Sequence, residues 1–437
     1  MPTGPEVCLS SRVHAWARGL LAVALLVVSP AVLRAQDAAA APGPPPAARV
    51  VAGQDGFALE SANGDYRLQI GVLLHVDGRF ALDDENEQYT DNFTVRRLRP
   101  YLRGRLARHF EFYLNPDFAG GTLTVQDAYV DTVFSPAFRV RAGKAKVPFG
   151  FERLQPATNM LFMERGFPTA LAPNRDIGVQ VLGDLFGGVV GYLAGVMNGV
   201  ADGASADLET NDGKDLSGRL VIRPFNRAKT GSSARGFGFG VSASRGDARG
   251  ILALPVLRTQ TLQQPYFSYA IAATPPAAAD GVRSRHSPSV WYFYKAFGGW
   301  AEYVHTDTPV RRGDTRADVD HDAWQVAGSW VLTGESATDS GSGVRPRRNF
   351  DFGHGGWGAF QIALRYHELE IDDRAFTLGF AAAGASGHAQ AFTAGLRWYL
   401  TGNLWYTLNF ERTVFDDDPS GPRRAENGLA FRTQLYF

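Results

Sequence analysis

A run of arginines between Phe93 and Leu106 has the spacing expected of an anion-binding strand. Four of them occupy odd-numbered positions: Arg97, Arg99, Arg103 and Arg105. Successive side chains of a strand point to opposite faces and recur on the same face every ~6–7 Å, so these four share one face. Leu98, Leu102 and Leu106 share the other face. A guanidinium stays charged and binds oxyanions through a planar fork of donors, so the run predicts a column of positive charge backed by an apolar face.

Carboxylates on neighbouring strands offer an alternative role for these arginines. Four acids follow within the next stretch of chain: Glu111, Asp117, Asp127 and Asp131. If they pair with the arginines, the column is neutralised and binds no free anion. Some arginines could do both, and the sequence leaves the two interpretations open.

Composition excludes several classes of function. The 437 residues carry 44 basic and 44 acidic side chains, a formal net charge of zero that argues against a general nucleic-acid binder. The single cysteine, Cys8, lies near the N-terminus, so the rest of the chain has no disulfide or thiolate chemistry. The histidines show no metal-like spacing, and we expect neither a metal nor another cofactor.

The N-terminus resembles an export signal. Arg12 and Arg18 precede the apolar run Leu20–Val28, and we expect cleavage after Ala35. An Ala/Pro-rich linker is predicted for residues 36–64. No later window is apolar and long enough for a membrane helix, which leaves a closed barrel as the only spanning structure.

Apolar and polar residues alternate along the remaining chain, from Tyr66 to the terminal Phe437. This period of two, repeated in many short segments, predicts an all-β, 16-stranded antiparallel transmembrane β-barrel over residues 65–437, because bacterial barrels have an even number of strands. The arginine face would then line the lumen, since an arginine facing lipid costs roughly 2–4 kcal/mol. Long loops are expected at 147–175, 198–213 and 306–320, and the segment Tyr266–Ala273 is ambiguous between strand and loop.

A second basic stretch runs from Arg139 to Gly166 and leads into an apolar loop. We expect this loop to fold inward and constrict the lumen, where Lys144, Lys146 and Arg153 would join the arginine column. The alternative is a surface loop with incidental charge.

Several ordered motifs resemble the phosphate-selective porin O and P family. They are Arg96-Arg97 after Phe93, Pro148-Phe149-Gly150-Phe151-Glu152, Met163-Glu164-Arg165, Asp176-Ile177-Gly178, Phe267-Ser268-Tyr269, Tyr303 after Glu302, Leu332-Thr333-Gly334-Glu335, and Asn427 with Arg432-Thr433-Gln434. The resemblance implies a homotrimeric porin with an arginine ladder leading to an anion site. It assigns Arg96 and Arg97 to the family's paired central arginines and Arg153 to the basic residue of its constriction loop.

Four departures and one conflict qualify this resemblance. The family's phosphate channels carry a lysine at the position of Glu111, an aspartate near that of Gln126, a tyrosine at that of Arg99, and serines at those of Pro156-Ala157. Anion preference therefore transfers better than strict phosphate selectivity. Strict alternation also places Arg96 and Arg97 on opposite faces. A β-bulge, or a position at the strand end, would bring both into the lumen.

The resulting hypothesis is an outer-membrane porin for passive, anion-selective diffusion of phosphate or related oxyanions. Anion-binding residues are predicted to be Arg96, Arg97, Arg99 and Arg153, and further pore-lining residues Arg103, Arg105, Glu111, Lys144 and Lys146. The expected partners are inorganic anions, outer-membrane lipid and two further copies of the chain. Alternatives are a general-diffusion porin, a structural or adhesion barrel, and an outer-membrane hydrolase using Ser386 and His388, for which no orienting acid is evident.

Overall fold

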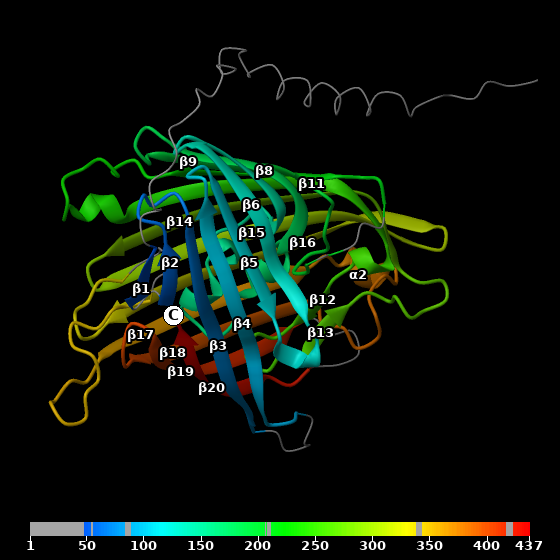
Figure 1. Ribbon diagram of the computed structural model, residues 1–437. Coiled ribbons are helices and arrows are strands. Elements are labelled where there is room, and N and C mark those ends of the chain that lie inside the picture. The colour runs from blue at the N-terminus through cyan, green and yellow to red at the C-terminus, as the bar shows by residue number, and fades with distance from the viewer. Residues whose placement is uncertain are drawn as a thin grey trace, which may run out of the picture. The chain divides into compact units, whose positions relative to one another are not determined.

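A closed antiparallel barrel forms the body of the protein in the computed structural model, which describes residues 48–53, 56–83, 89–205, 207, 211–337, 343–416 and 423–437 (Figure 1). Within these residues sixteen strands form the wall: β3 (Arg67–Leu82), β4 (Asn92–Leu106), β5 (Phe110–Asp117), β6 (Thr124–Ser135), β7 (Phe138–Lys146), β8 (Arg175–Leu185), β9 (Val190–Met197), β10 (Asp215–Ile222), β11 (Phe237–Gly250), β14 (Ala278–Tyr294), β15 (Phe297–Arg312), β16 (Thr315–Val331), β17 (Ala359–Ile371), β18 (His388–Tyr399), β19 (Leu404–Asp416) and β20 (Glu426–Tyr436). Each strand pairs with the next, and β20 pairs with β3 to close the ring. The predicted fold class is confirmed. The export signal lies outside the described residues.

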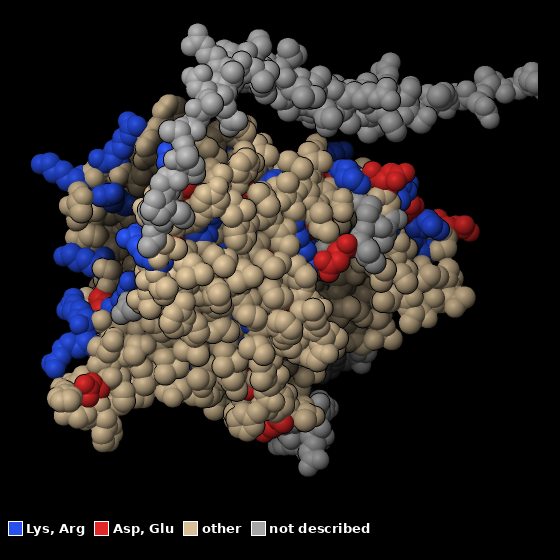
Figure 2. Space-filling model, viewed as in Figure 1, with Lys and Arg blue, Asp and Glu red and all other residues tan. Residues whose placement is uncertain are grey.

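Alternation along the strands explains the two-faced wall. On β4, Leu98 and Leu102 are exposed on the outer face, whereas Arg97 and Arg99 are buried on the inner face. Figure 2 shows that the outer wall facing the viewer is almost free of charge, while basic side chains gather at the end of the barrel near the C-terminus. An apolar exterior suits lipid and a polar interior suits water, as in outer-membrane barrels.

A short hairpin precedes the barrel, formed by β1 (Arg49–Gly53) and β2 (Gly56–Glu60). The expectation of a linker over the whole of 36–64 is therefore wrong for this segment. The pairing of β20 with β3 reaches only as far as Leu73, so the first residues of β3, Arg67–Ile70, would have a free edge. β2 pairs with these residues and covers that edge. Glu60 of the hairpin also forms ion pairs with Arg49 and Arg67, at 3.4 and 3.1 Å.

Long connections occur at both ends of the barrel, which we call the terminal end, where the chain finishes, and the distal end. At the distal end, long loops join β7 to β8, β9 to β10 and β11 to β14. The loop expected at 306–320 is wrong, because β15 and β16 extend through this polar sequence and turn at Gly313, where φ is +59°. Tyr266–Ala273 is not a wall strand, since β13 (Pro265–Ser268) pairs only with β12 (Val256–Arg258) in a separate two-stranded sheet.

Helical structure is confined to single turns. Among the described residues these are α2 (Arg374–Thr377) and 3₁₀ turns at Ala119–Gly121, Glu152–Leu154, Ala157–Asn159, Phe167–Ala170, Ser233–Gly236 and Ile251–Ala253. No helix in this part of the chain is long and apolar enough to cross a membrane. The main buried apolar cluster includes Phe149, Phe167 and Leu171 of the β7–β8 loop packed with Tyr266 and Phe267, so the loops fill part of the barrel.

Candidate functional site

The β7–β8 loop (residues 147–174) is held against inward-facing side chains of β15, β17 and β20. Arg432 of β20 donates to the Met163 carbonyl at 2.6 Å, and Arg365 of β17 donates to the Glu164 carbonyl at 3.0 Å. On β15, Glu302 accepts the Phe151 N–H at 2.5 Å and the Glu152 N–H at 3.1 Å. These bonds satisfy backbone groups that would otherwise be buried without partners, and they fix the loop inside the barrel.

The loop carboxylate Glu164 lies among four arginines, which we call the central cluster: Arg79, Arg96, Arg97 and Arg432. Its oxygens lie 2.6 Å from Arg79, 2.9 Å from Arg96, 3.7 Å from Arg97 and 3.5 Å from Arg432. Burial opposes the charge of Glu164, but Arg96, Arg97 and Arg79 outweigh it and hold its pKa well below its usual range. Together with Asp77, which pairs with Arg432 at 2.6 Å, two carboxylates face four guanidiniums.

A β-bulge brings Arg96 and Arg97 to the same side. His75 pairs with Arg97 and the next residue of β3, Val76, pairs with Val95, so Arg96 is the extra residue of β4. A bulge of one residue reverses the alternation locally. The conflict between the resemblance and strict parity is thereby resolved, and both arginines reach Glu164.

The acids on β5 and β6 all pair with arginines, but only Asp117 and Glu111 pair with arginines of the β4 column. Asp117 accepts from Arg99 at 2.7 Å, Asp127 from Arg175 at 3.0 Å and Asp131 from Arg141 at 2.7 Å. Glu111 lies 3.4 Å from Arg139 and 3.8 Å from Arg105. Arg99 is thus neutralised by a neighbour rather than left free for an anion.

Three cations at the root of the β7–β8 loop lack such neutralisation. Arg165 donates to the carbonyls of Glu152 and Gln155 at 3.1 and 2.6 Å. Lys146 donates to Leu154 and Gln155 carbonyls at 3.0 and 2.6 Å, and Arg153 donates to the Thr169 carbonyl. None of the three forms an ion pair with a carboxylate in the described part of the chain. We call Lys146, Arg153 and Arg165 the loop cations.

The electrostatics of the loop cations favour a counter-ion. Burial, together with repulsion from Arg165 and Arg175, lowers the pKa of Arg153 to about 9. Burial also lowers the pKa of Arg165 to about 10, with Glu152 opposing and Arg175 adding to the shift. Arg153 Nε is buried without a hydrogen-bond partner. A bound anion would relieve both the repulsion and the missing bond.

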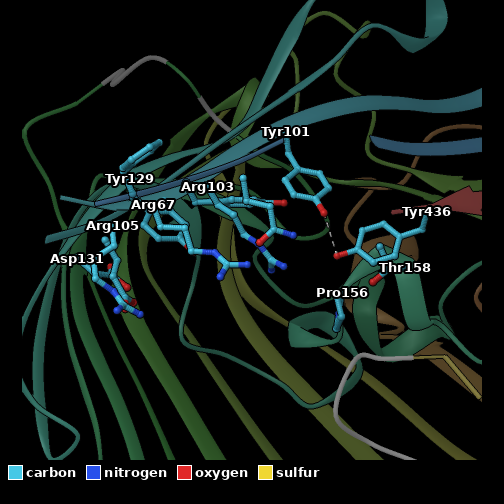
Figure 3. A pocket seen from close by; sticks show the side chains of 14 residues that line it. Arg67, Tyr101, Arg103, Arg105, Tyr129, Asp131, Pro156, Thr158 and Tyr436 are labelled. Carbon is cyan, nitrogen blue, oxygen red and sulfur yellow. Dashed lines mark hydrogen bonds and ion pairs between the residues drawn. The ribbon is translucent and has the colours of Figure 1, made fainter. Parts of the chain in front are cut away.

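Three neighbouring cavities run beside the loop. The distal cavity, of about 510 Å³, is lined by Arg153, Arg165 and the central pair Arg96 and Arg97. The middle cavity, of about 390 Å³, is lined by Lys146 and shares Arg99, Ala157 and Arg175 with the distal one. The terminal cavity, of about 500 Å³, is lined by Arg103, Arg105 and Glu111 and shares Tyr101, Tyr113, Tyr129, Pro156, Thr158 and Tyr436 with the middle one (Figure 3). The shared residues indicate a route along the β3–β8 wall.

The predicted site residues therefore divide into groups. Arg96, Arg97, Arg99 and Arg153 line the distal cavity, and Arg103, Arg105 and Glu111 the terminal one. Lys146 lines the middle cavity, whereas Lys144 lines none of the three and pairs with Asp207 of the β9–β10 loop. The pairing of β7 with β6 and β8 runs without a shift from Arg139 to Lys144, so Lys144 lies on the face opposite to Arg141, which faces the middle cavity. Lys146 reaches that cavity from the end of the strand.

Sequence reasoning missed several lumen arginines. Arg165 and Arg175 lie beside Arg153, and Arg79 and Arg432 complete the central cluster. The family-like motif Met163-Glu164-Arg165 was the available signal for Arg165. Arg79 and Arg432 share the inner face with Asp77 and Gln434, which alternation along β3 and β20 could have revealed.

The hydrolase alternative has no support in the geometry. The Ser386 side chain is buried, and its hydroxyl has no partner in the described structure. His388 instead contacts Glu368 at 2.9 Å. No group of three or more potential metal ligands occurs among the described residues.

A model of the phosphate-selective porin O and P family matches residues 68–437. The chain belongs to this family. It is an outer-membrane β-barrel porin, and the family is non-enzymatic. No curated protein matches the chain.

Solved structures share the barrel fold of this porin. OmpT of Vibrio cholerae with loop L8 deleted aligns with a TM-score of 0.52 at 10% identity, covering 85% of this chain and 100% of that chain. A trimer form of in-vitro folded OmpT gives 0.51 at 11% identity, covering 85% and 99%. Salmonella typhi OmpF in complex with daunomycin gives 0.52 at 11%, covering 86% and 100%. At these identities the likeness establishes the fold alone.

Proposed function

We propose that this porin passes anions selectively, and that a phosphate-like oxyanion pauses at the loop cations. The observation that carries the proposal is the contrast between two sets of basic residues. Arg96, Arg97 and Arg99 face carboxylates, whereas Lys146, Arg153 and Arg165 are held by backbone carbonyls only. Carbonyls orient these cations without neutralising them, which leaves their charge available to an anion.

The central cluster has a different role in this proposal. Four guanidiniums and two carboxylates keep an excess of positive charge beside the distal cavity. This excess attracts anions toward the loop cations without binding them directly. Several weak sites in series let an anion enter and leave, which conduction requires. We also propose that the β7–β8 loop is the constriction, since its residues line all three cavities.

Planar-bilayer recording tests the proposal. The porin is placed in a chloride gradient, the reversal potential gives anion selectivity, and added phosphate reports block of the chloride current. We expect the wild type to be anion-selective and blocked by phosphate, and Arg165→Gln to lose about tenfold in phosphate affinity, the loss of one charge-assisted interaction of ~1.5 kcal/mol.

Arg397→Gln is the matched control. Arg397 also donates to loop carbonyls, those of Met160 and Leu161, yet it lies outside the three cavities. If both variants weaken the block equally, the effect comes from loop displacement and the loop cations are not the site.

A general-diffusion porin is the second candidate. The pairing of Glu111, Asp117, Asp127 and Asp131 with arginines supports it, because it neutralises much of the lumen. A reversal potential near zero in the wild type would favour this candidate over anion selectivity.

Assembly and export complete the proposal. The uncharged outer wall of β3–β6 gives a surface on which copies of the chain can pack, and we propose a homotrimer (Figure 2). Native mass spectrometry of the purified porin tests this state. We further propose that the chain reaches the outer membrane after cleavage following Ala35, which N-terminal sequencing of the mature protein tests.

A further inference from the structure

A row of four tyrosine rings crosses the inner wall at the terminal cavity. Tyr436 of β20, Tyr101 of β4, Tyr113 of β5 and Tyr129 of β6 follow one another around the barrel. Their ring centroids are separated by 5.9, 6.0 and 5.8 Å in that order. Figure 3 shows Tyr101 and Tyr436 side by side, with Arg67, Arg103 and Arg105 nearby. These spacings are those of interacting aromatic pairs, so the four rings make one continuous aromatic surface.

Backbone features hold one end of the tyrosine row in place. Tyr101 must lean across β3 to reach Tyr436, and it does so over Gly71. A Cβ added to Gly71 would lie 2.2 Å from the Tyr101 ring, so only glycine leaves room for this crossing. The Tyr101 hydroxyl also donates to the Phe437 carbonyl at 2.9 Å. The end formed by Tyr101 and Tyr436 is therefore structural.

The other end of the row is open. Tyr113 and Tyr129 are half-buried and line both the terminal and the middle cavity. Neither hydroxyl makes a hydrogen bond with a residue that the structure describes. Arg141 covers one face of the Tyr129 ring, with its guanidinium carbon 3.8 Å from the ring centre. Tyr113 presents aromatic surface to the cavity.

A cation without a carboxylate partner lies beside the row. Arg103 is exposed, its Nε donates to the Gln69 side chain at 3.0 Å, and its guanidinium lies 5.6 Å from the centre of the Tyr101 ring. It forms no ion pair within the described ranges of the chain. Arg105 and Arg141, by contrast, face Glu111 and Asp131. Arg103 is thus the cation of this cavity that is free for an anion, and Tyr113 is its cross-strand neighbour.

We propose that the terminal cavity is a binding subsite for organic monophosphates whose phosphate is joined to a ring. The phosphate contacts Arg103, and the ring stacks on Tyr113, with the edge of Tyr129 beside it. An inorganic anion makes no use of aromatic faces, whereas a ring does. The cavity volume of about 500 Å³ lies within the range of small-molecule pockets. The inference rests on the proposed anion selectivity and extends it from inorganic to ring-bearing permeants.

Current block by two matched anions tests the subsite. 4-Nitrophenyl phosphate carries a ring and methyl phosphate does not, while both carry one phosphate group. Each is added to the terminal side of the wild-type channel in chloride, and the concentration giving half-block is measured. We expect half-block at about fivefold lower concentration for the ring-bearing anion, the size of one aromatic contact.

Three variants assign the effect to residues. Tyr113→Leu should remove the difference between the two anions, Tyr113→Phe should keep it, and Arg103→Gln should weaken block by both. Tyr129→Leu replaces Tyr113→Leu if the latter fails to insert. Equal block by the two anions in the wild type, or an unchanged ratio in the leucine variant, would overturn the subsite. Selectivity is read separately from the reversal potential, so a cation-selective channel would overturn the proposed function instead.

Discussion

Replacing Glu164 with glutamine should raise the excess positive charge of the central cluster and make it a stronger attractor of anions. The side chain keeps its size and one oxygen that can accept from Arg79 at 2.6 Å or Arg96 at 2.9 Å. It loses the charge that opposes four guanidiniums. The loop should therefore stay in place while the positive potential of the distal cavity rises.

The size of the effect follows from Coulomb's law. Two unit charges 4 Å apart interact by about 4 kcal/mol at an effective dielectric of about 20, and by about half of that at twice the separation. An anion held by Arg165, the next residue along the chain, lies within roughly this range of Glu164. Screening by salt reduces the gain further, to about 1 kcal/mol, which is about fivefold in affinity.

Phosphate block of chloride current measures this gain. We expect Glu164→Gln to be half-blocked at about fivefold lower phosphate than the wild type, with a similar open-channel conductance. Arg397→Gln is the control, because Arg397 also anchors the loop, through the Met160 and Leu161 carbonyls, and lies outside the three cavities. Unchanged or weaker block in Glu164→Gln, with normal conductance, would refute the reasoning.

Three further predictions concern pH, the terminal cavity and barrel closure. The pKa of Glu164 is lowered, so its ion pairs are complete at neutral pH and are lost only as the pH falls through that lowered pKa. Conductance should therefore stay constant down to about pH 4, the ordinary range of a glutamate pKa. A conductance transition between pH 5 and 6 would contradict this assignment. Glu111→Lys should raise anion selectivity at low salt but leave phosphate block unchanged, because Glu111 lines the terminal cavity and not the distal cavity. Stronger phosphate block in this variant would place Glu111 at the phosphate site. Gly71→Ala should destabilise the barrel by roughly 1–3 kcal/mol, because the added methyl group is overpacked against Tyr101 and the Phe437 carbonyl, and the urea midpoint of unfolding should fall. Gly53→Ala is the control, since its added methyl group meets nothing within 4 Å. Equal midpoints for the two variants would refute the packing argument.

The sequence predicted the barrel because period-two alternation is a local property that survives in every strand. Arg97, Arg99, Arg103 and Arg105 share the inner face as their parity required. The alternating segments numbered 16 or 17, and the even number of strands in bacterial barrels decided for 16. The β1–β2 hairpin was missed because its pairing depends on the offset between β3 and β20, which no single segment records.

The site was less predictable because its partners come from distant segments. Glu164 reaches Arg96 from 68 residues further along the chain, and it reaches Arg432 from across the closure of the barrel. The bulge at Arg96 changes the parity of β4 at one residue, which alternation alone does not reveal. The distinction between neutralised arginines and the loop cations therefore required the three-dimensional structure.

Locating a bound oxyanion tests the central claim most directly. A crystal of the full-length mature porin soaked in arsenate, measured at the arsenic absorption edge, would place the anion by anomalous scattering. The account predicts a peak in the distal cavity between Arg153 and Arg165, with Glu164 still paired to Arg96. A peak within the central cluster with Glu164 displaced, or no peak near the loop cations, would contradict it.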